Sequence, residues 1–434
     1  MRMHAAPANG APVGREVTGA PWRPLLSGEL RDGALHLAGA LTKTLPAATA
    51  TEHRNPSLAS GSAGLAVCTG QLARTRSDQM VADAALTHLE EAIDVLATEP
   101  LTSSLYSGFT GIAWAVELVD GLFGNEGEDR NGDIDDALTG LLRHYPEHAP
   151  YDLINGLTGL GVYALARWPR PGAAPCLFGV VEQLARRARH DRDGIYWWTP
   201  PSWRGPRGER YQPAGVDLGV AHGIAGVIPF LARVHRLGLA RPTVRPLLDG
   251  SVNWLLAHLV DTASGPTVPY FVADGVEPGP ARSAWCYGDP GVAAALMLAA
   301  RDAGEPAWAA AATDLAVRAA ARPAAQTGVA DAGLCHGSAG LAHLFGLMYQ
   351  MTSEPALADA ARFWVERTLE LCSAVTAVGA MPAGATAPGC KGPGLLEGTA
   401  GVALAMEAAC TAAEPVWDQM LLVSTAETAR AEAR

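Results

Sequence analysis

The sequence lacks any apolar run of the roughly 20 residues that a transmembrane helix needs. Its first 24 residues are rich in Ala, Pro and Gly and lack the continuous apolar stretch of a signal peptide. We therefore expect residues 1–24 to form a flexible N-terminal segment. Basic residues are outnumbered by acidic ones, and the net charge of −12 argues against nonspecific binding to nucleic acid.

Cysteine is also scarce, with seven residues, an odd number without the spacing of a disulfide framework. This favours a reducing compartment, and we predict a cytoplasmic protein. Five of the cysteines show no metal-ligand spacing and are interpreted as ordinary reduced thiols: Cys68, Cys176, Cys372, Cys390 and Cys410. We expect Cys390, in a glycine-rich loop, to be the most exposed of these.

Glycine, in contrast, is abundant and follows a repeat. The motif Gly-x-x-Gly, followed by small or apolar residues, occurs seven times at intervals of 47, 48, 67, 65, 49 and 61 residues. The seven turns are Gly61–Gly64, Gly108–Gly111, Gly156–Gly159, Gly223–Gly226, Gly288–Gly291, Gly337–Gly340 and Gly398–Gly401. A period of this size is typical of one helical hairpin per unit, stacked so that neighbours share a core.

The segments after the turns are apolar on all sides, as in Val292–Ala300, which predicts buried helices. Seven other segments have one apolar face and predict amphipathic helices: Leu25–Leu45, Ser77–Thr98, Asp133–Tyr145, Cys176–His190, Thr243–Val260, Glu305–Arg322 and Glu354–Cys372. Seven buried helices alternating with seven half-buried ones predict an all-α fold, a closed α/α toroid of seven inner and seven outer helices. We expect residues 25–434 to form one such domain, with longer loops at about 191–217 and 262–284.

Every glycine turn of such a ring lies at the start of an inner helix, so the side chains just before the turns converge on one rim. Cys286 and Cys335 each precede their glycine by two positions, and His336 precedes Gly337 by one. Two thiols and one imidazole are a ligand set typical of a catalytic zinc ion with one open position. Either segment by itself is compatible with simple packing, but the shared position in the repeat favours a metal site.

Two more candidates lie on this rim. His222 precedes Gly223 by one residue, and Asp152 lies four before Gly156. A histidine with a pKa near neutrality suits proton transfer, and we assign His222 as the general acid or base with Asp152 orienting it. The alternative for Asp152 is a helix-capping carboxylate. His343, on a predicted buried helix, is interpreted as a core histidine.

From about Ser57 to Cys410 the chain resembles the lanthionine synthetase C-like (LanC) family of class I lanthipeptide cyclases. The resemblance rests on the glycine turns and on three motifs: Ala221-His222-Gly223, Trp285-Cys286-Tyr287-Gly288 and Cys335-His336-Gly337. Tyr151-Asp152 and Arg282 also stand in the expected places. The glycine turns are a general packing motif, whereas the combination of the three motifs is specific.

The resemblance implies an α/α toroid that binds one Zn²⁺ per chain through Cys286, Cys335 and His336. His222, Asp152, Arg282 and Tyr287 would surround the reacting groups. The implied reaction adds cysteine thiols of a dehydrated precursor peptide to dehydroalanine or dehydrobutyrine, which forms thioether rings. The protein would work either alone or with a lanthipeptide dehydratase and an exporter, in which case it would be peripheral to a membrane-associated synthetase complex. For two of these residues an alternative remains: Arg282 could pair with an acidic neighbour, and Tyr287 could be a packing residue.

Three functions stay open at the level of the sequence. The first is the peptide thioether cyclase. The second is a LanC-like protein that adds glutathione to dehydroamino acids, and the third is a non-catalytic scaffold for a dehydratase with a structural zinc. The segment from Tyr196 to Arg204, rich in aromatic residues and proline, is either a substrate-facing wall or a small packed cap.

Overall fold

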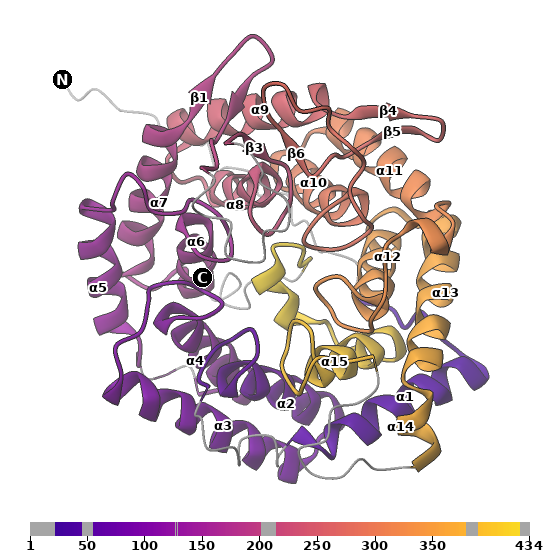
Figure 1. The fold of residues 1–434 in the computed structure, drawn as a ribbon. Helices are drawn as coiled ribbons and strands as arrows, with labels where there is room; N and C mark the ends of the chain where they lie inside the picture. The colour runs from indigo at the N-terminus through magenta and orange to yellow at the C-terminus, as the bar shows by residue number, and fades with distance from the viewer. Residues whose placement is uncertain are drawn as a thin grey trace, which may run out of the picture.

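The computed structural model describes residues 22–45, 55–125, 127, 129–200, 214–378 and 389–425. In these parts of the chain, seven helices begin directly after the first glycine of a repeat turn, and together they line the inside of a ring (Figure 1). These inner helices are α2 (Ser62–Arg76), α4 (Phe109–Phe123), α6 (Leu157–Arg167), α8 (Ile224–Arg236), α10 (Asp289–Ala303), α12 (Ser338–Thr352) and α15 (Thr399–Cys410).

The amphipathic segments form the outer layer of the ring in the order that the sequence predicts (Figure 1). They are α3 (Gln79–Thr98), α5 (Gly132–Arg143), α7 (Ala173–Arg187), α9 (Arg241–Ala257), α11 (Pro306–Ala320), α13 (Pro355–Leu371) and α1 (Gly28–Thr42). The helix α3 buries Ala85, Leu89 and Ala92 on one side only, whereas α2 is buried continuously from Ser62 to Ala73. The predicted α/α toroid with seven inner and seven outer helices is confirmed. A short helix, α14 (Ser373–Val378), follows α13.

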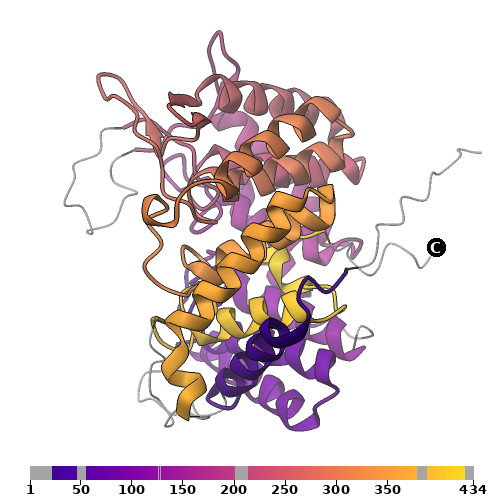
Figure 2. The ribbon, with the colours of Figure 1, turned by 90° about the vertical axis from the view of Figure 1, so that its right-hand side faces the viewer.

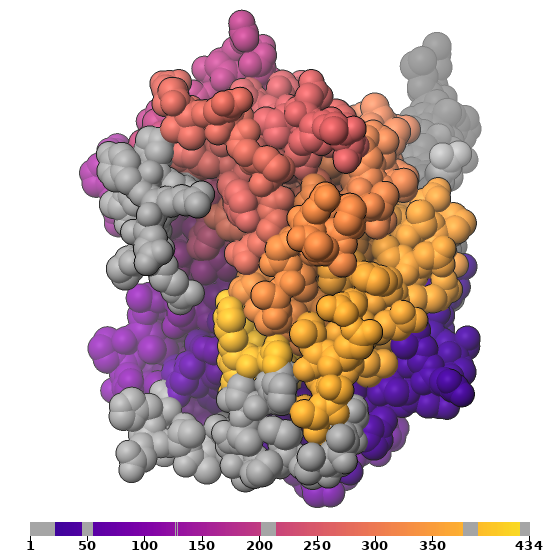
Figure 3. Space-filling model, turned by 45° about the vertical axis from the view of Figure 1, so that its right-hand side comes forward, coloured from indigo at the N-terminus to yellow at the C-terminus, as the bar shows by residue number. Residues whose placement is uncertain are grey.

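The ring closes where the first outer helix packs on the last inner one. The backbone N–H groups of Leu25 and Leu26 donate to Ala409 O, and Trp22 Nε1 donates to Ala408 O at 2.9 Å. In the space-filling view, the indigo start of the chain lies against the orange part of the chain that precedes its yellow end (Figure 3). Closure covers the apolar faces that an open array of hairpins would leave in water.

The turns themselves are joined by backbone hydrogen bonds that run around one rim. For six of the seven pairs of neighbouring turns, a backbone hydrogen bond joins the residue two before the first glycine of one turn to its equivalent in the next turn. The bonds are Ala59 N to Tyr106 O, Ile154 N to Ala221 O, Ala221 N to Cys286 O, Cys286 N to Cys335 O, Cys335 N to Leu396 O and Leu396 N to Ala59 O, at 2.8–3.3 Å. A side chain at this position of the repeat is therefore held beside the equivalent side chain of the neighbouring turn.

Glycine is required at these turns because the backbone of the same turn passes very close. A Cβ atom built on Gly111 would lie 1.8 Å from Leu105 O and 3.0 Å from Leu58 Cβ. No side chain fits into such a gap, so the turn and the close contact between neighbouring repeats depend on glycine.

The two longest intervals between turns contain short strands. They are β1 (Arg189–His190), β2 (Ile195–Tyr196), β3 (Val216–Asp217), β4 (Val260–Thr262), β5 (Gly265–Thr267) and β6 (Phe271–Val272). Strand β3 of the first interval pairs antiparallel with β6 of the second, in the register Val216↔Val272. The strands and loops of this part of the chain project from one side of the ring (Figure 2).

Part of the aromatic segment after β1 serves as packing. Trp197 is fully buried and its Nε1 donates to Leu184 O, while Tyr196 packs against Trp254 with ring centroids 5.3 Å apart. The cap interpretation holds for these residues, and Pro201 to Arg204 lie outside the described residues. Within the described ranges, no helix combines the length and the apolar character that crossing a membrane requires.

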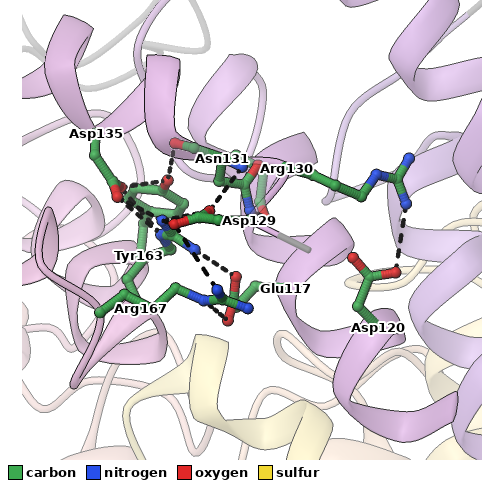
Figure 4. A network of polar contacts seen from close by, with 10 residues as sticks. Glu117, Asp120, Asp129, Arg130, Asn131, Asp135, Tyr163 and Arg167 are labelled. Carbon is green, nitrogen blue, oxygen red and sulfur yellow. Dashed lines mark hydrogen bonds and ion pairs between the residues drawn. The ribbon is translucent and has the colours of Figure 1, made fainter. Parts of the chain in front are cut away.

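A buried ionic network joins three helices at the end of α6 that is opposite its glycine turn (Figure 4). The Arg167 side chain is fully buried, and it bonds both oxygens of Asp135 at 2.6–3.1 Å and Glu117 Oε2 at 2.9 Å. Asp129 also pairs with Arg167, the Tyr163 hydroxyl donates to Asp135, and Arg170 contacts the other oxygen of Glu117. A buried charge stays in an apolar core only when it is paired in this way, so the network fixes how α4, α5 and α6 meet.

Candidate functional site

The candidate site lies on the glycine-turn rim, where Cys286 and Cys335 are neighbours in the ring of backbone hydrogen bonds. The Cys286 backbone N–H donates to Cys335 O at 3.3 Å. Because both residues stand two before a glycine, their side chains lie next to each other. One ligand atom from each of Cys286, Cys335 and His336 can be chosen so that all three lie within 4.8 Å of one another. The structure thus brings the three predicted zinc ligands together.

The pKa values of the two thiols are shifted in opposite directions, as in a pair that shares one negative charge. Their mutual hydrogen bond lowers the pKa of Cys286 despite burial, and the same bond together with burial raises the pKa of Cys335. His336 and the positive charge of Arg282 also favour the ionised form of Cys286. One thiolate is therefore available in this cluster near neutral pH, which a metal ion can exploit because thiolates are its ligands.

The imidazole of His336 provides the test of whether a metal fits. Its Nδ1 is buried and has no hydrogen-bond partner among the described residues, while Nε2 lies 3.1 Å from Lys391 Nζ. A buried ring nitrogen without a partner is costly unless a ligand satisfies it. The donor set of two sulfurs and one nitrogen also suits Zn²⁺. The residues present fit a zinc ion with three protein ligands.

A histidine–carboxylate pair stands on the next part of the rim. His222 Nδ1 is 2.7 Å from Asp152 Oδ2, and Asp152 Oδ1 accepts the Asn155 backbone N–H at 2.6 Å. Burial lowers the pKa of His222, but the hydrogen bond and charge of Asp152 outweigh it and raise the pKa above its ordinary value. One oxygen of Asp152 thus stabilises the turn before α6 and the other contacts His222, whereas α6 has no side-chain cap.

Tyr287 and Arg282 lie on the same rim. The Tyr287 ring is tilted against His222 with centroids 6.5 Å apart, and its hydroxyl donates to Asp217 Oδ2 at 2.8 Å. Arg282 Nε is buried and has no hydrogen-bond partner among the described residues. All seven predicted site residues thus lie around one rim, and their chemical roles stay predictions.

Several residues at the site were not predicted from the sequence. Asp217 and Asp331 both stand six before the first glycine of a turn, and each accepts a backbone N–H two residues further on. Tyr270 packs against Tyr287 at 5.2 Å, and its hydroxyl accepts the Arg282 backbone N–H. The repeat register could have revealed the two aspartates, whereas Tyr270 reaches the rim only through the β3–β6 pairing.

Two other predictions concern residues outside the site. His343 Nε2 contacts Asp418 Oδ2 at 3.0 Å inside the ring, so its interpretation as a core histidine is confirmed. Cys390 is the most exposed of the five cysteines without ligand spacing, as expected, but at 9% it is still largely buried. The cause is its thiol contact with Cys372 at the end of α13, a hydrogen bond that raises the pKa of Cys390 and lowers that of Cys372.

Comparison with known proteins agrees with this geometry. The family profile described as lanthionine synthetase C-like protein matches residues 52–422, and the chain belongs to this family. Among solved structures, nisin cyclase superposes with a TM-score of 0.70 at 20% identity, over 86% of this chain and 94% of that chain. An α-1,6-mannanase of Salegentibacter sp. HEL1_6 reaches a TM-score of 0.42 at 13% identity, over 88% of this chain and 99% of that chain. The likeness to nisin cyclase shows a shared fold, and that to the mannanase is too low to carry an argument. No curated protein sequence matches.

Proposed function

We propose that this protein is a zinc-dependent lanthipeptide cyclase that forms lanthionine and methyllanthionine thioether rings. The observation that carries the proposal is the convergence of Cys286, Cys335 and His336 beside the His222–Asp152 pair, on the rim of a LanC-like toroid. The family and the likeness to nisin cyclase support the same activity. The substrate is a precursor peptide that carries cysteine and dehydroamino acids.

Cys286, Cys335 and His336 would hold the zinc ion and leave its fourth position for the substrate thiol. Bound there, zinc would lower the pKa of that thiol and keep the sulfur nucleophilic. In the reaction, the thiol loses its proton, the sulfur forms a bond to Cβ of the dehydroamino acid, and the electron pair of the Cα=Cβ π bond moves toward the amide oxygen. One proton is then added at Cα in place of the one that the thiol lost, so the peptide mass does not change.

The protein side chains handle the proton and the charge. Asp152 holds Nδ1 of His222, which leaves Nε2 for proton transfer with the substrate. Tyr287, anchored on Asp217, limits rotation of the His222 ring. Arg282 would stabilise negative charge on the amide oxygen, and the effect of its positive charge on the neighbouring thiol of Cys286 supports this role.

A cytoplasmic location is part of this proposal, because free thiols and thiolate ligands persist in a reducing compartment. A dehydratase must supply the substrate, and an exporter would remove the product. Neighbouring reading frames that encode a dehydratase and a short peptide rich in Cys, Ser and Thr would identify both the substrate and these partners.

The activity is tested with the dehydrated precursor peptide. The protein should consume free peptide thiols without a change in peptide mass, as measured by thiol alkylation and mass spectrometry. Glutathione is added in a parallel reaction. A mass increase of one glutathione per dehydro residue would instead establish the glutathione-adding function, and thiols that persist in both reactions would contradict cyclase activity.

A further inference from the structure

Three charged side chains surround the outer nitrogen of the imidazole of His336. Asp331 Oδ2 lies 3.4 Å and Glu397 Oε1 3.8 Å from His336 Nε2. Lys391 Nζ lies 3.1 Å from the same nitrogen, 3.1 Å from Glu397 Oε2 and 3.6 Å from Asp331 Oδ2. Lys391 is one of only two lysines in the chain, so its position beside this histidine is not the result of a generally lysine-rich surface.

The two nitrogens of His336 have different environments. Nδ1 is the buried nitrogen without a partner in the described chain, and Nε2 faces the charged side chains. A metal ion binds a ring nitrogen that carries no proton, so an imidazole that binds through Nδ1 carries its proton on Nε2. That N–H then needs an acceptor, which in metal sites is commonly a carboxylate.

We propose that Asp331, assisted by Glu397, accepts the Nε2–H of His336 and thereby fixes the tautomer and ring orientation in which Nδ1 binds zinc. This rests on the proposed function, since it concerns the same metal. The ammonium of Lys391 cannot accept a proton, and its role is to neutralise two carboxylates that stand close together. Its side chain is 54% exposed, so it can turn toward Glu397 when Nε2 donates to Asp331.

Backbone hydrogen bonds hold the carboxylate of Asp331 and the main chain of Glu397 in place. Asp331 Oδ1 accepts the Gly333 backbone N–H at 3.1 Å, and Asp331 O accepts that of Ser338, the first residue of α12. Glu397 stands one before Gly398, and its carbonyl accepts the Lys391 backbone N–H at 2.9 Å. The side chain of Asp331 is also only 16% exposed, compared with 36% for Glu397. Asp331 is therefore the stronger of the two acceptors.

The test measures zinc affinity by competition with a chromophoric chelator in wild type, Asp331→Asn, Glu397→Gln and the double variant. Asparagine retains an oxygen for the Gly333 N–H but cannot present two acceptor oxygens. We expect zinc to bind about 10- to 100-fold more weakly in Asp331→Asn and in the double variant, the usual effect of losing such an acceptor. The control is Asp359→Asn, an exposed aspartate that pairs with Arg362 on α13, and its zinc affinity should equal that of wild type.

A second readout uses cobalt in place of zinc. The visible spectrum of the Co²⁺ protein reports the ligands and their geometry. It should change in Asp331→Asn because the orientation of His336 changes, whereas the far-UV circular dichroism should stay the same. Wild-type zinc affinity in the double variant would overturn this inference and leave the proposed cyclase intact. If the wild-type protein binds no zinc, the proposed metal site and this inference both fail.

Discussion

Each functional side chain on the rim owes its position to the glycine turn that follows it. Cys286 and Cys335 occupy one place in the repeat, while His222, His336 and Glu397 occupy the next. Because the turns are bonded to each other, two adjacent repeats can build a metal site from three residues, and two other adjacent repeats can build a proton-transfer pair. A single substitution should therefore affect either metal binding or proton transfer, but not both.

Replacing a metal ligand is expected to remove the zinc ion without unfolding the protein. The wild-type protein should contain one zinc ion per chain, and Cys286→Ala, Cys335→Ala and His336→Ala should each lose most of it, as measured by plasma mass spectrometry. Far-UV circular dichroism should be retained, because the helices supply their own core. Cys176→Ala, which removes a buried thiol of α7, is the control and should keep zinc. Full zinc content in the Cys286→Ala/Cys335→Ala double variant would contradict the assignment.

His222 is expected to serve the proton transfer and not the metal. The change His222→Asn should leave the zinc content unchanged and slow cyclisation by about 10²- to 10⁴-fold, the usual cost of losing a general acid or base. Metal analysis and the rate of thiol consumption measure the two effects separately. If this variant lost its zinc as completely as Cys335→Ala, His222 would have to be a fourth ligand and the site would be closed to substrate.

Asp152 is expected to set the pKa of His222. In Asp152→Asn the negative charge that raises this pKa is lost, so the pKa should fall, while the bond from the Asn155 backbone N–H can be kept. Protonated His222 then persists only to a lower pH than in wild type. The part of the pH–rate profile that depends on ionisation of His222 should therefore move to lower pH, whether His222 donates or accepts the proton. NMR titration of the imidazole measures the pKa directly, and an unchanged value would exclude this role of Asp152.

At the scale of the element, the glycine turn is the unit that combines fold and function. Gly288 has φ 90° and ψ −175°, a conformation open to glycine almost alone, and a Cβ there would lie 1.8 Å from Arg282 O. The turn cannot relax without moving Cys286, two residues earlier, or Arg282, six residues earlier. Backbone strain at this position is therefore expected to disturb the metal site as well as the helix start.

The variant Gly288→Ala should lower the free energy of unfolding by at least about 1–3 kcal/mol through backbone strain alone, and it should also lower zinc affinity. Urea denaturation and chelator competition measure these quantities. The matched control is Gly140→Ala on the exposed side of α5, where a Cβ meets no atom within 4 Å. That change should stabilise the protein by about 0.5–1 kcal/mol, because alanine is the better helix former. Equal stability of the two variants would contradict the strain argument.

At the scale of the whole molecule, closure of the ring joins the two ends of the chain. The bond from Trp22 to Ala408 spans 386 positions, so α1 can pack on α15 only when the repeats between them are in place. The segment after α15 also reaches the inside of the ring. Trp285 Nε1 donates to Leu421 O at 2.9 Å, and the Tyr106 hydroxyl donates to Met420 O at 2.7 Å. This segment supports the rim from within, directly behind Cys286.

Loss of packing on α1 should therefore also destabilise α15, which lies far from α1 in the sequence. Leu37 is fully buried on α1, and Leu37→Ala should cost about 2–5 kcal/mol, the usual range for a buried leucine. Hydrogen exchange should rise in α15 as well as in α1. The control is Glu29→Ala on the exposed side of α1, which should not change hydrogen exchange in α1 or in α15. If exchange increased in α1 alone, closure would not couple the two ends.

Hydrophobic periodicity was sufficient to predict the helices and their layers, because it is a local property that burial imposes on every repeat. The ends of the outer helices lie within a few residues of the predicted ones, for example Gln79–Thr98 against Ser77–Thr98. The degree of burial is not a local property in the same way. Cys390, in a glycine-rich loop, is the most exposed of the five cysteines without ligand spacing, as predicted, but its contact with Cys372 at the end of α13 leaves it only 9% exposed.

The sequence by itself determined the toroid, the rim and the candidate site residues, since a repeated turn places equivalent residues at equivalent positions. The tertiary structure decided which side chains touch: Cys286 with Cys335 through the bond between their turns, and His222 with Asp152. It also brought Asp217 to Tyr287 and Glu397 to His336. These contacts join residues that are far apart in the chain, and their distances depend on the closure of the whole ring, which no local pattern encodes.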